Sequence, residues 1–290
     1  MPVRYIDLMT EITPSLPPFP IAEMGEPVLT PLVRPVRESR VMLLSSAGVH
    51  LKGEPPFKST NDLTFRRISQ SCRPTDLVLS HPAPVRRPGE ADINVVHPYE
   101  RLSELADVGV IGAVTSHHLS VLGAIKTLNE LVTDLVPRLA ADARAAGADL
   151  VLAVPLCPAC HQAVGLMSRG LEREGIPTIT MTGARDITER VKPPRSAFLN
   201  YPLGNCIGPP NDAAQQREVL KAALSIAESV ETAGTIVDLP FEWPDPNWEA
   251  ETEALYRRDR DTVLSQRLKS EYQGSENTAV TECVDVCSLV

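Results

Sequence analysis

Short apolar runs alternate with longer amphipathic stretches through the second half of the chain. The apolar runs are rich in Val, Ile and Leu and have the length of buried strands, whereas the stretches between them have helical spacing. We therefore predict strands at 149–155, 176–181 and 236–239, and helices at 158–174 and 212–232. Alternating strands and helices form a parallel sheet with helices on both faces.

The pattern of the first half is less regular. Residues 1–39 are rich in proline and have no clear period, so we interpret them as an extended arm or a meander packed on a domain. Residues 119–146 have helical spacing, and Pro137 should kink or divide that helix. Shorter apolar runs predict strands at 40–48, 76–80, 93–96 and 108–112, with a short helix at 98–105.

These elements predict an α/β fold of two flavodoxin-like or Rossmann-like parallel-sheet halves with a cleft between them. The first half comprises residues 1–118, including the arm, and the second comprises residues 119–243. Residues 244–290 would form a charged helix at 247–272 and a flexible tail.

Composition narrows the function classes. A net charge of -9 and an aromatic content of 4% give no support to a nucleic-acid partner. No stretch approaches the ~20 apolar residues that span a bilayer, and the first residues do not resemble a secretory signal, so we expect a cytoplasmic protein without a membrane partner. The nucleotide-binding glycine motifs are absent, and we predict no bound cofactor.

The sequence Cys157–Pro158–Ala159–Cys160 lies between a predicted buried strand and a predicted helix. The start of a helix lowers the pKa of a thiol, and Pro158 suits the first helical position. We therefore predict that Cys157 is an attacking thiolate and that Cys160 is the thiol that closes a disulfide. His161 is either a proton donor near the thiolate or an exposed residue of the first turn.

Histidines that adjoin short apolar runs are candidates for general acids. If the runs are parallel strands, their carboxyl ends lie along one edge of the sheet. We expect His81 and His117 to protonate a leaving group, with His118 in a supporting role. The alternative for each is a structural histidine with its hydrogen bonds satisfied.

Two segments of the first half, Ser45–Lys52 and Asp92–Leu105 continuing to Gly112, resemble the selenoprotein B family of glycine, sarcosine, betaine and D-proline reductases. In the second half the same resemblance rests on Leu152–Cys160, Gly175–Thr178 and Pro202–Asn205. It extends over roughly residues 40 to 230.

The resemblance implies a function. Cys157 falls on the family's selenocysteine position and Cys160 on its second thiol, so the implied reaction is reductive cleavage of a carbon–heteroatom bond. A thioredoxin-type system or another external thiol would then reduce the oxidised pair of Cys157 and Cys160. This sequence departs from the family in three ways: sulfur replaces selenium, the chain resembles the shorter members, and no segment matches the pyruvoyl-forming one. The substrates named for the family are therefore not assigned to this chain.

Further residues have possible roles at this site. Asp92 and Asn94 would orient a histidine or the substrate, or else stabilise a turn. Asn205 and Cys206 lie in a loop that resembles one near the family's active site, although Cys206 is equally typical of a packed cysteine. Cys283 and Cys287 form a possible redox shuttle in the tail.

Two alternatives stay open. The protein could be a zinc-binding protein or a metal-dependent lyase whose ligands are Cys157, Cys160, His161 and Cys206. The chain could also be a non-catalytic subunit that joins a larger complex through its charged helix, or it could form a homo-oligomer.

Overall fold

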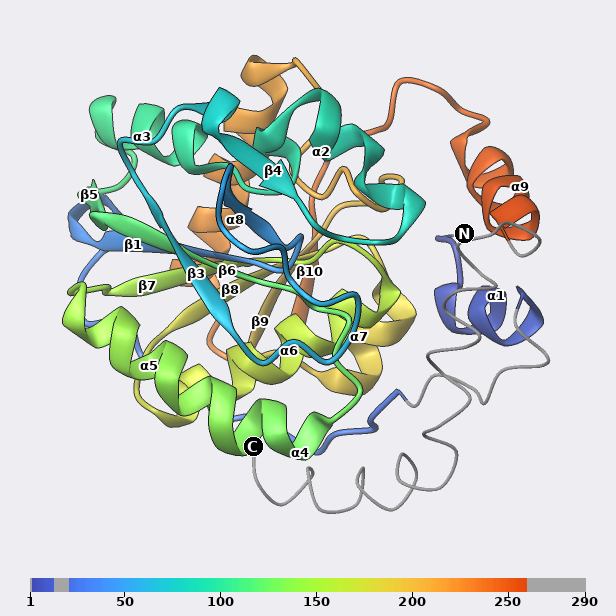
Figure 1. Ribbon diagram of the computed structural model, residues 1–290. Coiled ribbons are helices and arrows are strands. Elements are labelled where there is room, and N and C mark those ends of the chain that lie inside the picture. The colour runs from blue at the N-terminus through green and yellow to red at the C-terminus, as the bar shows by residue number, and fades with distance from the viewer. Residues whose placement is uncertain (1, 13–20, 260–290) are drawn as a thin grey trace.

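The computed structural model describes residues 2–12 and 21–259. Its centre is one twisted sheet in the order β10-β9-β8-β7-β1-β6-β3, with β5 paired to the start of β1 (Figure 1). Neighbouring strands are parallel, except that β3 runs antiparallel to β6. The strands are β1 (Arg40–Ser45), β3 (Phe65–Ser69), β5 (Ala113–Val114), β6 (His117–Val121), β7 (Leu150–Val154), β8 (Thr178–Thr182), β9 (Arg195–Phe198) and β10 (Thr235–Asp238).

Helices cover both faces of the sheet (Figure 1). One face carries α4 (Leu128–Glu130), α5 (Val136–Ala145), α6 (Pro158–Arg173) and α7 (Arg185–Val191). The other carries α3 (Tyr99–Asp107) and α8 (Ala213–Ser229), which contact each other. At one end of the molecule α1 (Tyr5–Ile12) contacts both α7 and α9 (Trp248–Asp259). None of the helices in the described ranges has the length and hydropathy needed to cross a bilayer.

A smaller antiparallel sheet lies beside the large one. It pairs β2 (Val49–Leu51) with β4 (Leu77–Leu79), and α2 (Arg87–Ala91) follows it. The chain enters β2 four residues after the end of β1, so the small sheet is held close to the carboxyl end of β1. This placement brings the loop after β4 to the candidate site.

Central strands are buried on both faces, which explains their composition. All five residues of β7 and all five of β8 are buried, as are the last five of β1. Strands covered on both faces have near-continuous apolar runs rather than alternation, and this is the pattern from which residues 149–155 were predicted. The α/β class is thereby confirmed.

The large sheet is continuous across the two proposed parallel-sheet halves. β1 hydrogen-bonds to β6 on one side and to β7 on the other, so one sheet runs through both of the proposed halves. The proposed boundary after residue 118 falls inside β6.

Three local predictions before residue 147 are wrong. Residues 93–95 form a 3-10 turn, because the Asp92 side chain accepts the N–H of Asn94 and caps it. Residues 108–112 form turns before β5. The predicted helix at 119–146 begins only at Leu128, and its early residues belong to β6.

Pro137 does not break the helix that contains it. The helix instead has a π-helical segment at Leu131–Leu135, immediately before α5 begins. Proline has no N–H to donate to the carbonyl four residues earlier, and a π-helical segment absorbs this loss without ending the helix.

The proline-rich arm packs along the main body. Its Ala22 N–H donates to Gln162 Oε1 of α6, and its Thr30 N–H donates to Glu172 Oε2 near the end of that helix. Arg195 pairs with the same Glu172 carboxylate and donates to the Thr30 carbonyl. Of the charged helix predicted at 247–272, α9 represents 248–259; the remainder, with Cys283 and Cys287, lies outside the described residues.

Candidate active site

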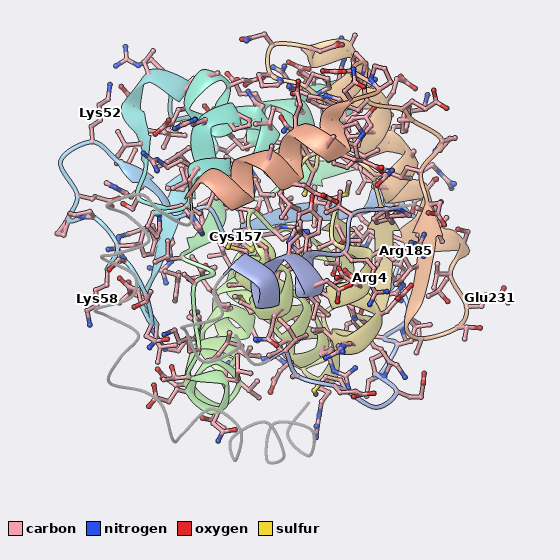
Figure 2. The ribbon with its side chains drawn as sticks, turned by 90° about the vertical axis from the view of Figure 1, so that its right-hand side faces the viewer. Arg4, Lys52, Lys58, Cys157, Arg185 and Glu231 are labelled. Carbon is pink, nitrogen blue, oxygen red and sulfur yellow. The ribbon has the colours of Figure 1, made fainter. Side chains whose placement is uncertain are left out.

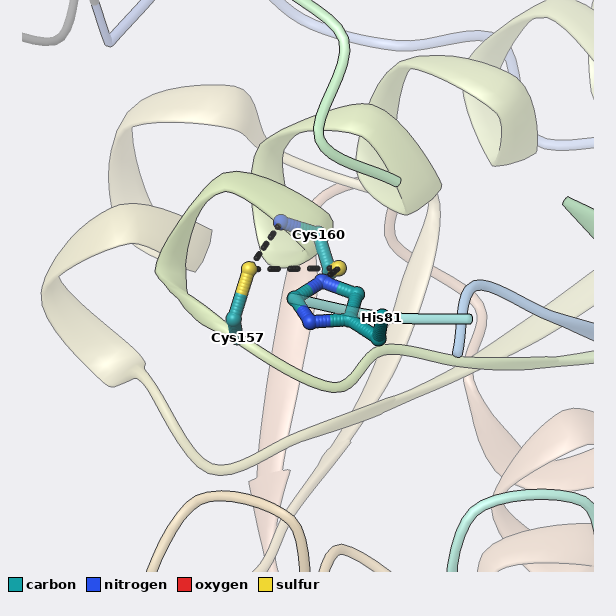
Figure 3. Close-up of side chains that lie close together, drawn as sticks. All are labelled: His81, Cys157 and Cys160. Carbon is teal, nitrogen blue, oxygen red and sulfur yellow. Dashed lines mark hydrogen bonds between the residues drawn. The ribbon is translucent and has the colours of Figure 1, made fainter. Parts of the chain in front are cut away.

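The two cysteines of the C-x-x-C motif lie beyond the carboxyl end of β7. Cys157 is the N-cap of α6, and its Sγ accepts the N–H of Cys160 at 3.4 Å. The two Sγ atoms are 3.3 Å apart and carry free thiols (Figure 3). Cys157 keeps 6% of its surface exposed and Cys160 keeps 0%. In Figure 2, which faces the end of the molecule with α1 and α9, Cys157 is visible near the centre.

His81 is the third member of this group. Its Nε2 lies 3.3 Å from Cys160 Sγ (Figure 3). Its Nδ1 accepts the backbone N–H of Ala83 at 3.1 Å. An imidazole nitrogen that accepts an N–H carries no proton itself, so the ring proton is on Nε2. His81 therefore donates a hydrogen bond to the Cys160 sulfur.

Backbone groups complete the surroundings of Cys160. The Ser46 carbonyl lies 3.6 Å from Cys160 Sγ, in position to accept an S–H, and it also accepts the N–H of Gly123 at 3.0 Å. A Cβ on Gly123 would lie 2.7 Å from Cys160 Sγ, so this position has no room for a side chain. No sequence pattern marks Gly123 as a site residue, whereas Ser46 lies in the resemblance segment Ser45–Lys52.

The two thiols have opposite pKa shifts. Burial opposes ionisation of Cys160, but the hydrogen bond from Cys157, the electrostatic attraction of the His81 ring and the hydrogen bond from His81 outweigh it, and the pKa of Cys160 lies well below the usual value. The hydrogen bond that Cys157 donates to Cys160, together with burial, raises the pKa of Cys157 well above the usual value. These two directions favour ionisation of Cys160 before Cys157, the opposite order from the one expected from the helix start alone.

His161 does not contact the thiols through its ring. Its Nδ1–H donates to the Cys157 carbonyl at 2.8 Å, and its Nε2 accepts the N–H of Gly183 at 3.0 Å. Burial lowers its pKa to about 4, so the ring is neutral near pH 7. The predicted roles of proton donor and exposed first-turn residue are both replaced by a structural one, in which His161 ties α6 to the loop after β8.

His117 and His118 lie at the start of β6, and their rings bond elsewhere. His117 Nε2 is 2.6 Å from Asp142 Oδ1 on α5. His118 Nδ1 accepts the N–H of Leu43, its Nε2–H donates to Gln70 Oε1, and burial lowers its pKa to about 3. The structure gives neither residue a contact with the cysteines.

Asp92 and Asn94 have the turn chemistry that was their alternative interpretation. Asp92 accepts the N–H of Asn94 through Oδ1 and, through Oδ2, the N–H of Asn211 and the Nε2–H of Gln216. This carboxylate ties the 3-10 turn to the start of α8. Asp92 and Asn94 also line a pocket of about 500 Å³ whose lining contains no cysteine.

The loop after β9 contains the other two candidates. Asn205 is buried and donates through Nδ2 to the Pro202 carbonyl, whereas its Oδ1 has no partner in the described structure. Cys206 is buried, and burial raises its pKa to about 12, with a smaller contribution from the charge of Cys160. Cys206 is therefore a protonated, packed thiol.

A metal could find three ligand atoms at this site. The ligand atoms of His81, Cys157 and Cys160 lie within 4.8 Å of one another, and this group contains neither His161 nor Cys206. Two thiolates and an imidazole match zinc by type. However, His81 could bind a metal through Nε2 only by moving its proton to Nδ1, where it would face the Ala83 N–H. The residue types fit zinc, and the hydrogen bond that orients His81 opposes it.

Fold and site together define a class: an α/β protein with a buried dithiol at the carboxyl end of a mostly parallel sheet. Two curated proteins are similar in sequence to this chain, and their names confirm the resemblance to the selenoprotein B family. The chain is 28% identical to the D-proline reductase subunit gamma of Acetoanaerobium sticklandii over 217 residues, which are 75% of this chain and 90% of the relative.

The second relative is more distant. The chain is 23% identical to the glycine reductase complex component B subunit gamma of Carboxydothermus hydrogenoformans over 230 residues, covering 76% of this chain and 52% of the relative. It thus spans about half the length of that relative. No protein-family model matches the chain. No solved structure matches it either. The chain is thus a homologue of reductase subunits.

Proposed function

We propose that the protein is a cysteine-dependent reductase that cleaves an activated carbon–heteroatom bond and is left with a Cys157–Cys160 disulfide. The observation that carries this proposal is the pair of free Sγ atoms 3.3 Å apart at the start of α6. The separation is short enough for a disulfide to form with a small movement. The names of both relatives, which are reductase subunits, support the same reaction class.

The two cysteines have different parts in the reaction. Cys157 is the attacking sulfur, because it is the more exposed of the two and lies at the helix start. In the first step Cys157 forms a bond to carbon, and the heteroatom leaves with the electron pair of the broken bond. In the second, Cys160 attacks the Cys157 sulfur, the S–S bond forms, and the carbon leaves with its electron pair and takes a proton. The substrate gains two electrons and the two thiols lose two.

An external reductant must then restore the dithiol. A small dithiol or a thioredoxin-like protein would do this by thiol–disulfide exchange. Cys283 and Cys287 are a further candidate from the chain itself. The activated position is a carbon next to a carbonyl group, since such a group stabilises the electron pair left on carbon in the second step.

A zinc site made by His81, Cys157 and Cys160 is the competing function, favoured by the clustering of their ligand atoms. The Ala83 N–H opposes it, as described above. A non-catalytic role in a larger assembly is a second competitor, because both relatives are named as subunits.

A trapping experiment tests the proposal. The reduced protein is mixed with a ketone that carries a heteroatom leaving group on its α-carbon, and the products are identified by mass spectrometry. Wild type should yield one reduced ketone and one disulfide per protein. Cys160→Ser should form a covalent adduct on Cys157 more slowly than wild type and stop there, because the resolving thiol is missing.

Two further variants make the outcome interpretable. Cys206→Ser, in which a buried packed thiol is removed, should behave as wild type. Cys157→Ser should form neither adduct nor reduced ketone. Reduced ketone in the same yield from Cys157→Ser would refute the proposal, as would stoichiometric zinc that protects both thiols in the purified protein.

A further inference from the structure

We propose that neutral His81 is a positioning residue whose fixed Nε2–H holds the resting negative charge on Cys160, so that Cys160, and no histidine, is the base that takes the proton of Cys157. This inference rests on the proposed dithiol function and assigns the proton steps within it. It replaces the expectation that a histidine protonates the leaving group.

The first step is the direction of the His81 hydrogen bonds. The Ala83 N–H donates to Nδ1 at 3.1 Å, and this donor is two residues along the same loop. Protonating Nδ1 would place two N–H groups against each other, so the ring is held in the Nε2–H form. Because Nε2 already carries the only proton of the neutral ring, His81 can donate to Cys160 but cannot accept its proton.

The second step is the position of Cys160 between two donors. Its Sγ lies 3.3 Å from His81 Nε2 and 3.3 Å from Cys157 Sγ. Other titratable groups near this sulfur are His161, which is neutral and bonded to backbone, and Cys206, which is protonated.

The third step is the path of the proton. As Cys157 attacks the substrate carbon, its proton crosses to the Cys160 sulfur along the existing hydrogen bond. The Ser46 carbonyl at 3.6 Å is then in position to accept the new Cys160 S–H. When Cys160 attacks the Cys157 sulfur, that proton passes to the departing carbon. One proton thus serves both steps, and charge is conserved: a monoanionic dithiol gives a disulfide, a protonated carbon and an anionic leaving group.

The structure also explains why Cys160 is suited to this role and Cys157 to attack. Cys160 has no exposed surface, so its charge is kept from solvent and from substrate. Gly123 lies on one side of it, where a side chain would not fit. The buried Cys160 sulfur therefore holds the negative charge. The more exposed Cys157 sulfur attacks the substrate as its proton passes to Cys160.

The test compares two substitutions that both remove the titratable ring. In His81→Gln the side-chain amide can still donate to Cys160, whereas His81→Leu has a similar volume and no donor. The protein is labelled with ¹³C at cysteine Cβ, and the ionisation of each cysteine is followed by NMR against pH without any substrate. We expect Cys160 to ionise before Cys157 in wild type and in His81→Gln. In His81→Leu the midpoint of Cys160 should rise by about one pH unit or more.

A second measurement does not depend on how the variants fold. The ¹⁵N shifts of His81 in wild type report which ring nitrogen carries the proton, and we expect Nε2. A proton on Nδ1, ionisation of Cys157 before Cys160, or equal shifts in the Gln and Leu variants would overturn the inference. Because no substrate is present, these results are independent of the trapping experiment: the hydrogen-bond role can fail while the reductase survives, or the reverse.

Discussion

His81 and His117 look alike in the sequence and have opposite positions in the structure. Each adjoins a short apolar run, and each was expected at the carboxyl edge of the sheet. His81 reaches Cys160 from the loop after β4, whereas His117 is the first residue of β6 and bonds Asp142. The difference shows that whether a residue reaches the site depends more on the end of the strand at which it lies than on its being next to a strand.

His81 reaches the site by a route that the parallel-strand argument did not include. β4 belongs to the small antiparallel sheet, and the N–H of Ser80 donates to the Gly48 carbonyl just beyond β1. This contact places the next residue, His81, beside the end of β1. The prediction that His81 lies near the cysteines thus rested on an incomplete reason.

The largest expected effect is on turnover, which should depend on the region around Cys157 and not on the region around His117. Cys157→Ser should reduce turnover of the α-substituted ketone by about a thousandfold or more, because the nucleophile is lost. His117→Gln should leave turnover within about twofold, since its ring contacts Asp142 and no thiol. Steady-state measurement of ketone reduction checks both, and a comparable loss in His117→Gln would show that the two histidines are not separate.

The second effect is a loss of stability in acid that comes from the interior histidines. Burial lowers the pKa of His161 to about 4 and that of His118 to about 3, so both are neutral in the folded protein and take up a proton on unfolding below pH 6.5. Stability is therefore complete above pH 6.5 and falls as the pH decreases, by about 2 kcal/mol for each residue at pH 5. Urea unfolding at pH 7 and pH 5 measures this loss, and His118→Gln should reduce it. A pH-independent free energy of unfolding would contradict the neutral, buried state.

The third effect tests the packing around Cys160. In Gly123→Ala the new Cβ would meet Cys160 Sγ at 2.7 Å and Cys160 Cα at 2.9 Å. We expect a loss of about 1–3 kcal/mol of unfolding free energy from overpacking. The variant should also form the disulfide more slowly, because the sulfur is displaced.

The control for this substitution is Gly25→Ala, since no heavy atom lies within 4 Å of the position that its Cβ would occupy. Chemical unfolding and the rate of disulfide formation are measured for both. Equal values for Gly123→Ala and wild type would mean that Cys160 is not held as described.

The smallest expected effect concerns Asp142, the partner of His117. Asp142 binds both His117 and Arg67 and is mostly buried. Asp142→Asn should cost about 0.5–1.5 kcal/mol of unfolding free energy. It should leave the ionisation of both thiols unchanged in the ¹³C experiment; a shift there would connect the two regions.

The sequence predicted the second half of the fold better than the first for a physical reason. β7, β8 and α6 are long, periodic or fully apolar, and local pattern determines them. β6 was assigned to a helix because His117–Val121 is short and its spacing continues into the helix that follows, while its pairing with β1 and β3 is non-local.

The candidate site shows the same division. Position at a helix start identified Cys157 and Cys160, and this is a local feature. Which of the two carries the charge depends on His81, Ala83 and Ser46, which come from distant parts of the chain and meet only in three dimensions. The helix dipole alone favoured Cys157, and the hydrogen bonds to Cys160 outweigh it.

The most direct test of the central claim is cysteine mapping of the anaerobically purified protein by mass spectrometry, before and after mild oxidation. We predict a metal-free protein that loses two hydrogens and yields a peptide linking Cys157 to Cys160, reversibly on addition of a dithiol. A stoichiometric metal adduct that protects these two cysteines, or oxidation that leaves them unlinked, would contradict the dithiol account.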